Sequence, residues 1–184
     1  MSRVALIMAG GTGGHIFPGL AVAEGLQQRG WHVHWLGAPA PSMESRLVPP
    51  HGIEMHAVEF GGLRGKGLMA KLRLPQRLLK AFAQSRQILT QLKPQVVVGL
   101  GGYISFPGGC MARALGVPLV LHEQNAVAGM ANRWLARMAQ RVFSAFPQVL
   151  PQGQWVGNPL RAEFLAQSAP DVGFDGRSEE HTSE

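Results

Sequence analysis

The sequence has 184 residues, of which 46% are hydrophobic and 15% are charged, and its formal net charge is +6. This composition excludes an intrinsically disordered or coiled-coil chain, and the length suits one α/β domain better than two. The single cysteine, Cys110, excludes an internal disulfide, as is usual in a reducing cytosol, and no apolar run reaches the ~18 residues of a membrane span.

The predicted elements alternate between strand and helix. Residues 3–8 are almost continuously apolar, which is typical of a strand buried on both faces of a parallel sheet. A helix follows that carries Pro18 in its first turn and ends at Gly30. The next expected elements are a strand at residues 31–36, a short helix near residues 42–48 and a strand at residues 53–58.

The alternation continues in the second half of the chain. Helices are expected at residues 68–74 and 76–92, because Pro75 between them should kink or break a helix. This order predicts an α/β fold with a Rossmann-like doubly wound parallel sheet, whose ligands bind at the carboxyl ends of the strands. Residues 1–165 are expected to form this domain and residues 166–184 a tail. The remaining expected elements are strands at residues 96–98, 117–121 and 142–145 and helices at residues 104–115 and 130–140.

A glycine-rich segment with the sequence GGTGGH occupies residues 10–15, between the first strand and the first helix. Its backbone N–H groups and the positive end of the helix can receive an anion. The spacing is not the dinucleotide fingerprint, because Ile16 stands where the third glycine belongs, and no acid ends the second strand. A nicotinamide dehydrogenase is therefore disfavoured, while a turn that only joins strand to helix stays open as the alternative.

His15 stands at the start of this first helix, where a neutral imidazole can accept a proton. It is therefore a candidate general base, and a capping or merely exposed histidine is the alternative. A second glycine-rich segment, residues 99–109, follows the fourth strand and precedes a helix. The two segments could form one pocket to which Ser105 supplies a hydroxyl, unless these glycines only permit close helix packing.

Polar residues follow the fifth strand in the sequence HEQN, residues 122–125, and four consecutive polar side chains are not expected in a core. Glu123 could orient or protonate a histidine. Asn125 could bond sugar hydroxyls or cap the next helix. Farther on, Arg161 suits a phosphate or sugar contact, although a lone surface arginine is more often simply solvated.

Positive charge is concentrated in the body of the chain. Residues 1–170 hold 16 lysines and arginines against 6 acidic residues, a net +10, whereas residues 171–184 hold 1 against 5, a net −4. No acidic residue occurs between Glu59 and Glu123. A stretch of one sign indicates an anionic partner, which could be phosphate, nucleic acid or a membrane surface.

Residues 68–86 interleave apolar side chains with cations, as in a protein that rests on an anionic bilayer. One apolar face of the helix is expected to pack on the sheet, and the other apolar residues are left among the cations. Nucleic acid is the competing partner, but aromatic stacking groups are sparse here. A solvated basic helix also stays open. The residues expected to contact a membrane are Met69, Lys71, Leu72, Arg73, Arg77, Leu79 and Lys80.

Five motifs occur in a fixed order over residues 3–161, and together they resemble the MurG family of bacterial glycosyltransferases. The motifs are GGTGGH at residues 10–15, GLRGKG at 62–67, GGYISFPGG at 101–109, HEQN at 122–125 and GNPLR at 157–161. The resemblance implies the N-terminal, acceptor-binding domain of an inverting GT-B enzyme. Such an enzyme transfers N-acetylglucosamine from UDP-N-acetylglucosamine to lipid I, which yields lipid II for peptidoglycan.

The resemblance also implies roles for single residues. Thr12, Gly13, Gly14 and His15 would lie by the diphosphate of the lipid acceptor and the reaction centre. We take His15 as the candidate base and Glu123, which stands beside a histidine in the sequence, as its candidate support. The remaining substrate-binding residues would be Asn125 and Arg161 for UDP-N-acetylglucosamine, and Gly102, Tyr103 and Ser105 on the acceptor side of the cleft.

The resemblance further implies that no metal or other cofactor takes part. The enzyme would sit peripherally on the cytoplasmic face of the inner membrane. Its partners would be lipid I, the sugar nucleotide, an anionic membrane surface, and cell-wall and division proteins, but not nucleic acid.

The family has a second Rossmann-like domain that supplies most donor contacts, and nothing in this sequence encodes it. Residues 177–184, RSEEHTSE, look like a translated sequencing adapter, so the natural protein is expected to diverge near residues 173–176. The chain is therefore expected to fold as half of an enzyme and not to transfer sugar by itself. A non-catalytic phosphate- or nucleic-acid-binding Rossmann module is the alternative function.

Overall fold

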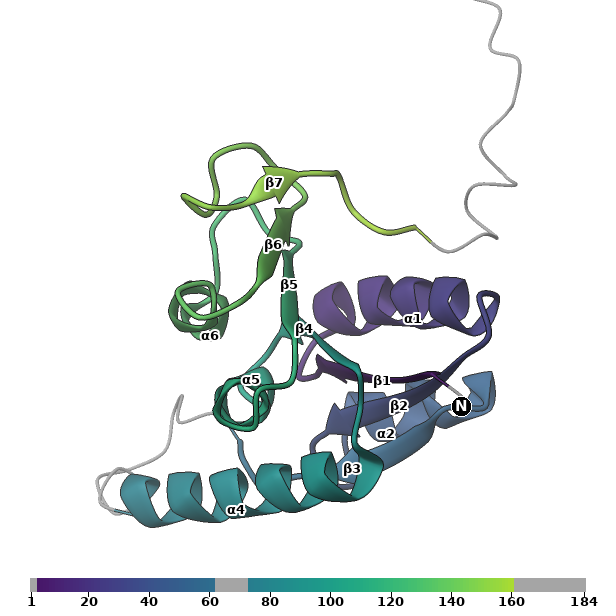
Figure 1. The fold of residues 1–184 in the computed structure, drawn as a ribbon, viewed down its shortest axis with the longest axis vertical. Helices are drawn as coiled ribbons and strands as arrows, with labels where there is room; N and C mark the ends of the chain where they lie inside the picture. Colours follow the sequence, from purple (N-terminus) through teal and green to yellow (C-terminus); the bar gives the residue numbers. More distant parts are fainter. Residues whose placement is uncertain (1–2, 62–72, 161–184) are drawn as a thin grey trace, which may run out of the picture.

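A parallel sheet of seven strands forms the centre of the molecule in a computed structural model, which describes residues 3–61 and 73–160. The strands lie in the order β3-β2-β1-β4-β5-β6-β7, and every neighbouring pair is parallel (Figure 1). Their bounds are β1 (Arg3–Ala9), β2 (Trp31–Gly37), β3 (Glu54–Ala57), β4 (Val96–Gly101), β5 (Leu119–Glu123), β6 (Arg141–Ser144) and β7 (Gln154–Trp155).

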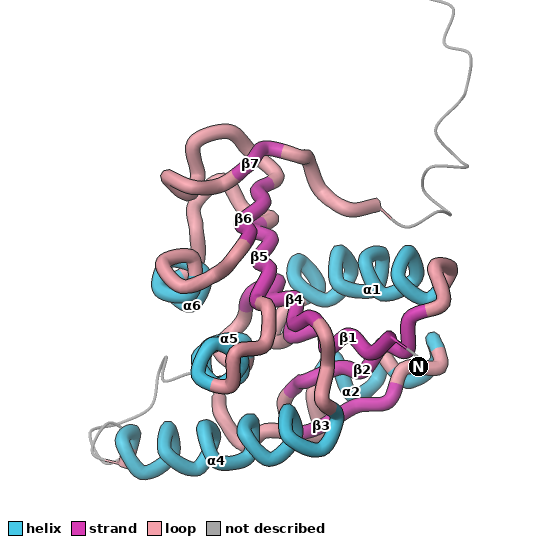
Figure 2. Tube along the Cα trace, viewed as in Figure 1, coloured by secondary structure: helices cyan, strands magenta, loops and turns pink. Residues whose placement is uncertain are grey.

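Helices cover both faces of this sheet, which confirms the predicted doubly wound architecture (Figure 2). Helix α1 lies on one side of the sheet, and α4 and α5 lie on the other. The helices are α1 (Gly13–Gln27), α2 (Met43–Leu47), α4 (Leu74–Leu92), α5 (Ser105–Ala114) and α6 (Met130–Leu135), with a short 3-10 turn at Pro49–His51.

Strand β1 shows why the sheet must be covered on both faces. Leu6 and Met8 belong to the core under α4 and α5, whereas Ile7 and Ala9 belong to the core under α1, and all four are fully buried. Successive side chains of a strand point to opposite faces, so a continuous apolar run needs an apolar partner on each side.

Several element boundaries differ from the predicted ones. Pro75 does not interrupt α4; it occupies the first turn of this helix, where a missing N–H group costs no hydrogen bond. The expected helix at residues 68–74 falls almost entirely outside the described residues. Strand β4 continues to Gly101, α6 ends at Leu135, and β7 was not predicted.

The second glycine-rich segment is therefore not one long loop. Only residues 102–104 connect β4 to α5. Gly108 and Gly109 lie inside α5, where a side chain would collide with Met8 and Leu135 respectively. For these two glycines the alternative of close helix packing is confirmed.

Among the described residues, no helix is both long and apolar enough to cross a membrane.

Gly19 offers a test of the packing between α1 and β2. A Cβ at this position would lie 2.5 Å from Cη2 of Trp35, a fully buried ring whose Nε1 donates to the carbonyl of Ala9. The same atom at Gly25 in the same helix would meet only Nη1 of Arg29, at 3.5 Å.

We therefore expect Gly19→Ala to lower the free energy of unfolding by about 1–3 kcal/mol relative to Gly25→Ala, because helix propensity changes equally in both. Urea denaturation of the two variants measures the difference. Equal stabilities would contradict the packing described here.

Candidate active site

The site lies where the chain changes direction across the sheet. After β1 the chain builds β2 and β3 on one side, and after β3 it returns to place β4 on the other side of β1. The loops that leave β1 and β4 therefore meet at the carboxyl ends of two adjacent strands, where ligands of such sheets bind. Gly102 has φ +85°, and a Cβ there would collide with the carbonyl of Gly10, so the contact requires glycine.

The first loop presents unused backbone donors. Thr12 is the N-cap residue of α1, but its side chain makes no capping hydrogen bond, and the first turn carries no acidic residue. The amide groups of a first turn have no acceptor within their own helix. A Cβ at Gly14 would meet only Oγ1 of Thr12, at 3.7 Å, so the approach is open. The predicted anion-binding geometry is present, while its ligand stays a prediction.

Glu44 is hydrogen-bonded to this loop. Its side chain is 1% exposed, and its carboxylate accepts hydrogen bonds from the amides of Ala38 (3.0 Å) and Gly11 (3.4 Å). A Cβ at Gly10 would lie 2.5 Å from Oε1 of Glu44, so the carboxylate fits only beside glycine. Sequence reasoning gave Glu44 no role and missed its contact with the loop.

His15 lies in the first turn of α1 and is held from two sides. Its Nδ1 is 3.0 Å from Oε1 of Gln124, and its ring packs against Gly101. A Cβ at Gly101, whose φ is +110°, would lie 2.8 Å from Cε1 of that ring. The first loop, the end of β4 and the end of β5 thus meet at one histidine.

The hydrogen bonds around Gln124 determine the tautomer of His15. The Nε2 group of Gln124 lies 2.9 Å from the carbonyl of His122, which can only accept, so this end is the amide NH2 and Oε1 faces His15. Nδ1 of His15 must then donate. In the neutral ring, Nε2 is left with a free lone pair, which is the form a general base needs.

The same hydrogen bonds determine which ring nitrogen of His122 carries the proton. Its Nε2 lies 2.8 Å from the carbonyl of Gly157 and must donate, so its Nδ1 accepts from Gln124 at 3.1 Å. Burial lowers the pKa of His122 below its ordinary value, although the Gly157 carbonyl and the charge of Glu123 act in the opposite direction. The neutral form that this chain of hydrogen bonds requires is therefore the form present at neutral pH.

The HEQN segment is buried, contrary to the expectation that it lies outside the core. His122, Glu123 and Gln124 are at most 6% exposed, and the first two end β5 instead of following it. Buried polar side chains are tolerated because each finds partners, which the sequence alone did not reveal. Asn125 is exposed, as expected of a ligand-binding residue.

Glu123 does not provide the expected contact with His15, and the structure gives that contact to Gln124. The carboxylate of Glu123 accepts hydrogen bonds from four donors within 3.0 Å. They are the amide and Nδ2 of Asn125, the amide of Gly129 and Nδ2 of Asn132. Glu123 therefore shapes the loop that leads to α6 and holds Asn125.

A cavity of about 490 Å³ brings three of the sequence motifs together. It joins Gly13 and Gly14 of the first loop to Gln124 and Asn125, and residues 158–160 of the GNPLR motif close it. Phe17 and Pro18 complete the wall. Asn158 was not among the predicted site residues, and Arg161 lies outside the described part of the chain.

Ser105 has a different role from the predicted one. The side chain is fully buried, and its Oγ lies 3.0 Å from the carbonyl of Met8 and 2.7 Å from that of Gly101. The single hydroxyl proton is shared by these carbonyls, so the expectation that Ser105 binds substrate is wrong; Ser105 ties α5 to β1 and β4. Tyr103, at 47% exposure, stays accessible next to Gly102.

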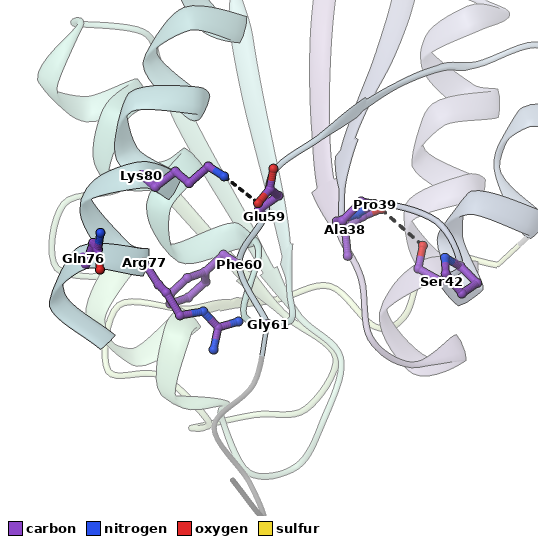
Figure 3. A pocket seen from close by; sticks show the side chains of 10 residues that line it. Ala38, Pro39, Ser42, Glu59, Phe60, Gly61, Gln76, Arg77 and Lys80 are labelled. Atoms are coloured by element: carbon purple, nitrogen blue, oxygen red, sulfur yellow. Dashed lines mark hydrogen bonds and ion pairs between the residues drawn. The ribbon is translucent and has the colours of Figure 1, made fainter. Parts of the chain in front are cut away.

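A second cavity, of about 540 Å³, opens between the end of β2 and the start of α4 (Figure 3). Arg77 and Lys80 line it, and Nζ of Lys80 lies 2.7 Å from Oε2 of Glu59. The hydrogen bond from Lys80 lowers the pKa of Glu59. The charge of Lys80 is thus paired, which the one-sign stretch in the sequence did not suggest.

The other predicted membrane residues divide into two groups. Arg73 is exposed, and Leu79 is 69% exposed, as a contact with a bilayer requires. Met69, Lys71 and Leu72 lie outside the described residues. The opposite face of α4 packs on the sheet as expected, with Leu89 buried in the core.

Comparisons with known proteins identify relatives of this chain and of its fold. The model of the glycosyltransferase family 28 N-terminal domain matches residues 5–144. Two curated relatives are named UDP-N-acetylglucosamine–N-acetylmuramyl-(pentapeptide) pyrophosphoryl-undecaprenol N-acetylglucosamine transferase. They come from Polaromonas sp. strain JS666 and Polaromonas naphthalenivorans, and they are 61% and 62% identical over 96% and 95% of this chain. The chain spans 47% and 50% of their lengths.

Solved structures agree with the sequence comparisons. The crystal structure of Acinetobacter baumannii MurG is 42% identical and superposes with a TM-score of 0.76, over 92% of this chain and 50% of that one. The Streptomyces glycosyltransferase SsfS6, complexed with thymidine diphosphate, is 13% identical with a TM-score of 0.56, over 83% of this chain and 52% of that one, and shares the fold alone.

The hydrogen-bond directions around Gln124 can be observed in the ¹⁵N-labelled chain. Long-range ¹H–¹⁵N spectra near pH 7.5 are expected to show His15 protonated at Nδ1 and His122 protonated at Nε2. In Gln124→Leu the acceptor is lost, so His15 should shift toward the Nε2–H form of a free imidazole. Exposed His51 serves as the internal control and should not change; an Nε2–H form of His15 in the unaltered chain would contradict the assignment.

Proposed function

Because this chain belongs to glycosyltransferase family 28, as an N-terminal domain of that family, we propose that the protein carrying it transfers N-acetylglucosamine from UDP-N-acetylglucosamine to lipid I. The observation that carries the proposal is the position of His15, whose free Nε2 stands beside an open anion-binding loop. The names and high identity of the relatives support the choice of substrates.

In the proposed reaction the acceptor is the C4 hydroxyl of the muramoyl sugar. Its oxygen attacks the anomeric carbon of N-acetylglucosamine while Nε2 of His15 takes the proton. The bond from the anomeric carbon to UDP breaks, and UDP leaves with the electron pair. Because the attack comes from the face opposite UDP, the configuration inverts. The imidazolium that forms is stabilised by the Nδ1–H donation to Gln124.

The charges of both substrates need partners. We assign the acceptor diphosphate to the first-turn amides at Gly13 and Gly14, whose partial positive charge suits an anion. Asn125 is assigned to the donor sugar, because it is exposed in the cavity next to Gln124. Arg161 is assigned to the donor by resemblance. In the proposal these protein groups stabilise the charges of the substrates, and no metal or other cofactor is required.

The reaction is proposed for the whole protein, since the chain spans about half the length of the curated relatives it matches. The uridine and the donor diphosphate then find most of their contacts in the half that corresponds to the rest of those relatives. We expect no sugar transfer by residues 1–184 alone. A phosphate- or nucleic-acid-binding module without catalysis is the alternative.

We further propose that the protein rests peripherally on the cytoplasmic face of the inner membrane, where lipid I and the cell-wall and division proteins are available. Leu79 supports this location, because it is exposed on α4, whose N-cap residue Arg73 is also exposed. An apolar side chain among cations is the combination that binds anionic lipid.

The role of His15 can be tested in the whole protein with UDP-N-acetylglucosamine and lipid I. We expect His15→Gln to lower kcat by about 10²–10⁴-fold and to leave the KM for the donor nearly unchanged, because the base acts on the acceptor proton. Gln124→Leu should lower kcat by a smaller factor, since it alters the tautomer and not the base itself.

His51→Gln is the matched control, because His51 is exposed on the turn at Pro49–His51. Activity of His15→Gln equal to that of this control would exclude His15 as the base. Binding of phosphate or DNA by the whole protein without any turnover would favour the non-catalytic alternative.

The membrane contact can be tested by sedimentation of the chain with vesicles that contain phosphatidylglycerol. We expect binding that weakens as salt is raised from about 0.1 M to 0.5 M, and a loss of about 10-fold or more in Leu79→Ser, because burying a leucine contributes about 1.5–3 kcal/mol. Leu115→Ser, at the C-cap of α5, is the matched control for an exposed leucine. Equal binding to neutral vesicles, or stronger binding to DNA, would contradict the proposal.

A further inference from the structure

Three side chains with metal-binding atoms meet at the edge of the sheet, away from both cavities. His34 of β2 pairs in register with Glu54 of β3, and His56 follows two residues later in β3. Residues two apart in a strand project to the same face, so all three side chains lie on one face of the β2–β3 pair. None of them lines either cavity.

The distances between the candidate ligand atoms suit an ion with tetrahedral coordination. Nδ1 of His34 is 3.1 Å from Nε2 of His56 and 3.5 Å from Oε2 of Glu54, and Nε2 of His56 is 3.8 Å from Oε1 of Glu54. One ligand atom of each residue lies within 4.8 Å of the other two. Bonds of about 2.0–2.1 Å in a tetrahedral zinc site separate the ligand atoms by about 3.3 Å, so small adjustments suffice.

The surroundings favour an ion over a simple pair of histidines. Both imidazoles are held with their side chains 19% exposed and with ring nitrogens directed at each other, where only one of the two can carry the shared proton. The carboxylate of Glu54 is 68% exposed, which leaves a fourth coordination position open to water. Two imidazoles and one carboxylate with an open position are a known ligand set for zinc.

We propose that His34, Glu54 and His56 bind one divalent transition-metal ion of the zinc class, with water as the fourth ligand. The ion bridges β2 to the edge strand β3 and thereby stabilises this end of the sheet. Because the residues belong to neither the first loop nor the HEQN segment, the ion takes no part in the proposed sugar transfer. The two proposals are therefore independent.

The test is calorimetric titration of Zn²⁺ into the untagged, metal-free chain, followed by the absorption spectrum of the Co²⁺ form. We expect one ion per chain, tetrahedral Co²⁺ bands between about 550 and 700 nm, and a melting temperature that rises with Zn²⁺. His34→Gln and His56→Gln should each weaken the affinity by at least about 10-fold and abolish the rise in melting temperature.

His51→Gln and His32→Gln are the controls, because both histidines are exposed and neither belongs to the cluster. Circular dichroism establishes that each variant is folded. The proposal is overturned if the unaltered chain shows no saturable binding below about 100 μM Zn²⁺, or if the control variants lose as much affinity as the cluster variants.

Discussion

The side-chain amide of Gln124 has one accepting end and one donating end, and the carbonyl of His122 determines which end faces which neighbour. The hydrogen bonds of the His15 and His122 rings take their direction from this choice. Oε1 must accept from His15, and Nε2 must donate to the ring of His122, whose far nitrogen donates to Gly157. A general base can be prepared in this way without any charged residue beside it.

The site also depends on the absence of side chains at its centre. Gly10 leaves room for the carboxylate of Glu44, and Gly101 leaves room for the ring of His15. Gly102 allows the loop after β4 to touch the loop after β1. Several of the 24 glycines are thus explained by bulky groups that need a neighbour with no Cβ.

The order of elements and the position of the site could be predicted from the sequence, because both rest on local signals. The apolar run of β1 and the glycines at residues 10–14 indicate a buried strand that opens into an anion-binding turn. The burial and the hydrogen-bond partners of Gln124, Glu123 and Ser105 could not be predicted from local signals. Whether a polar side chain is buried depends on partners that are distant in the sequence: Met8 for Ser105, His15 for Gln124.

Trp35 connects the core to the site. Its ring fills the space beside Gly19 of α1, and its Nε1 donates to the carbonyl of Ala9, the last residue before the glycine-rich loop. A change that displaces this ring would alter the exit of β1 and the entry of α1 together. Loss of core packing on heating and loss of ligand affinity should therefore occur in one transition of this domain.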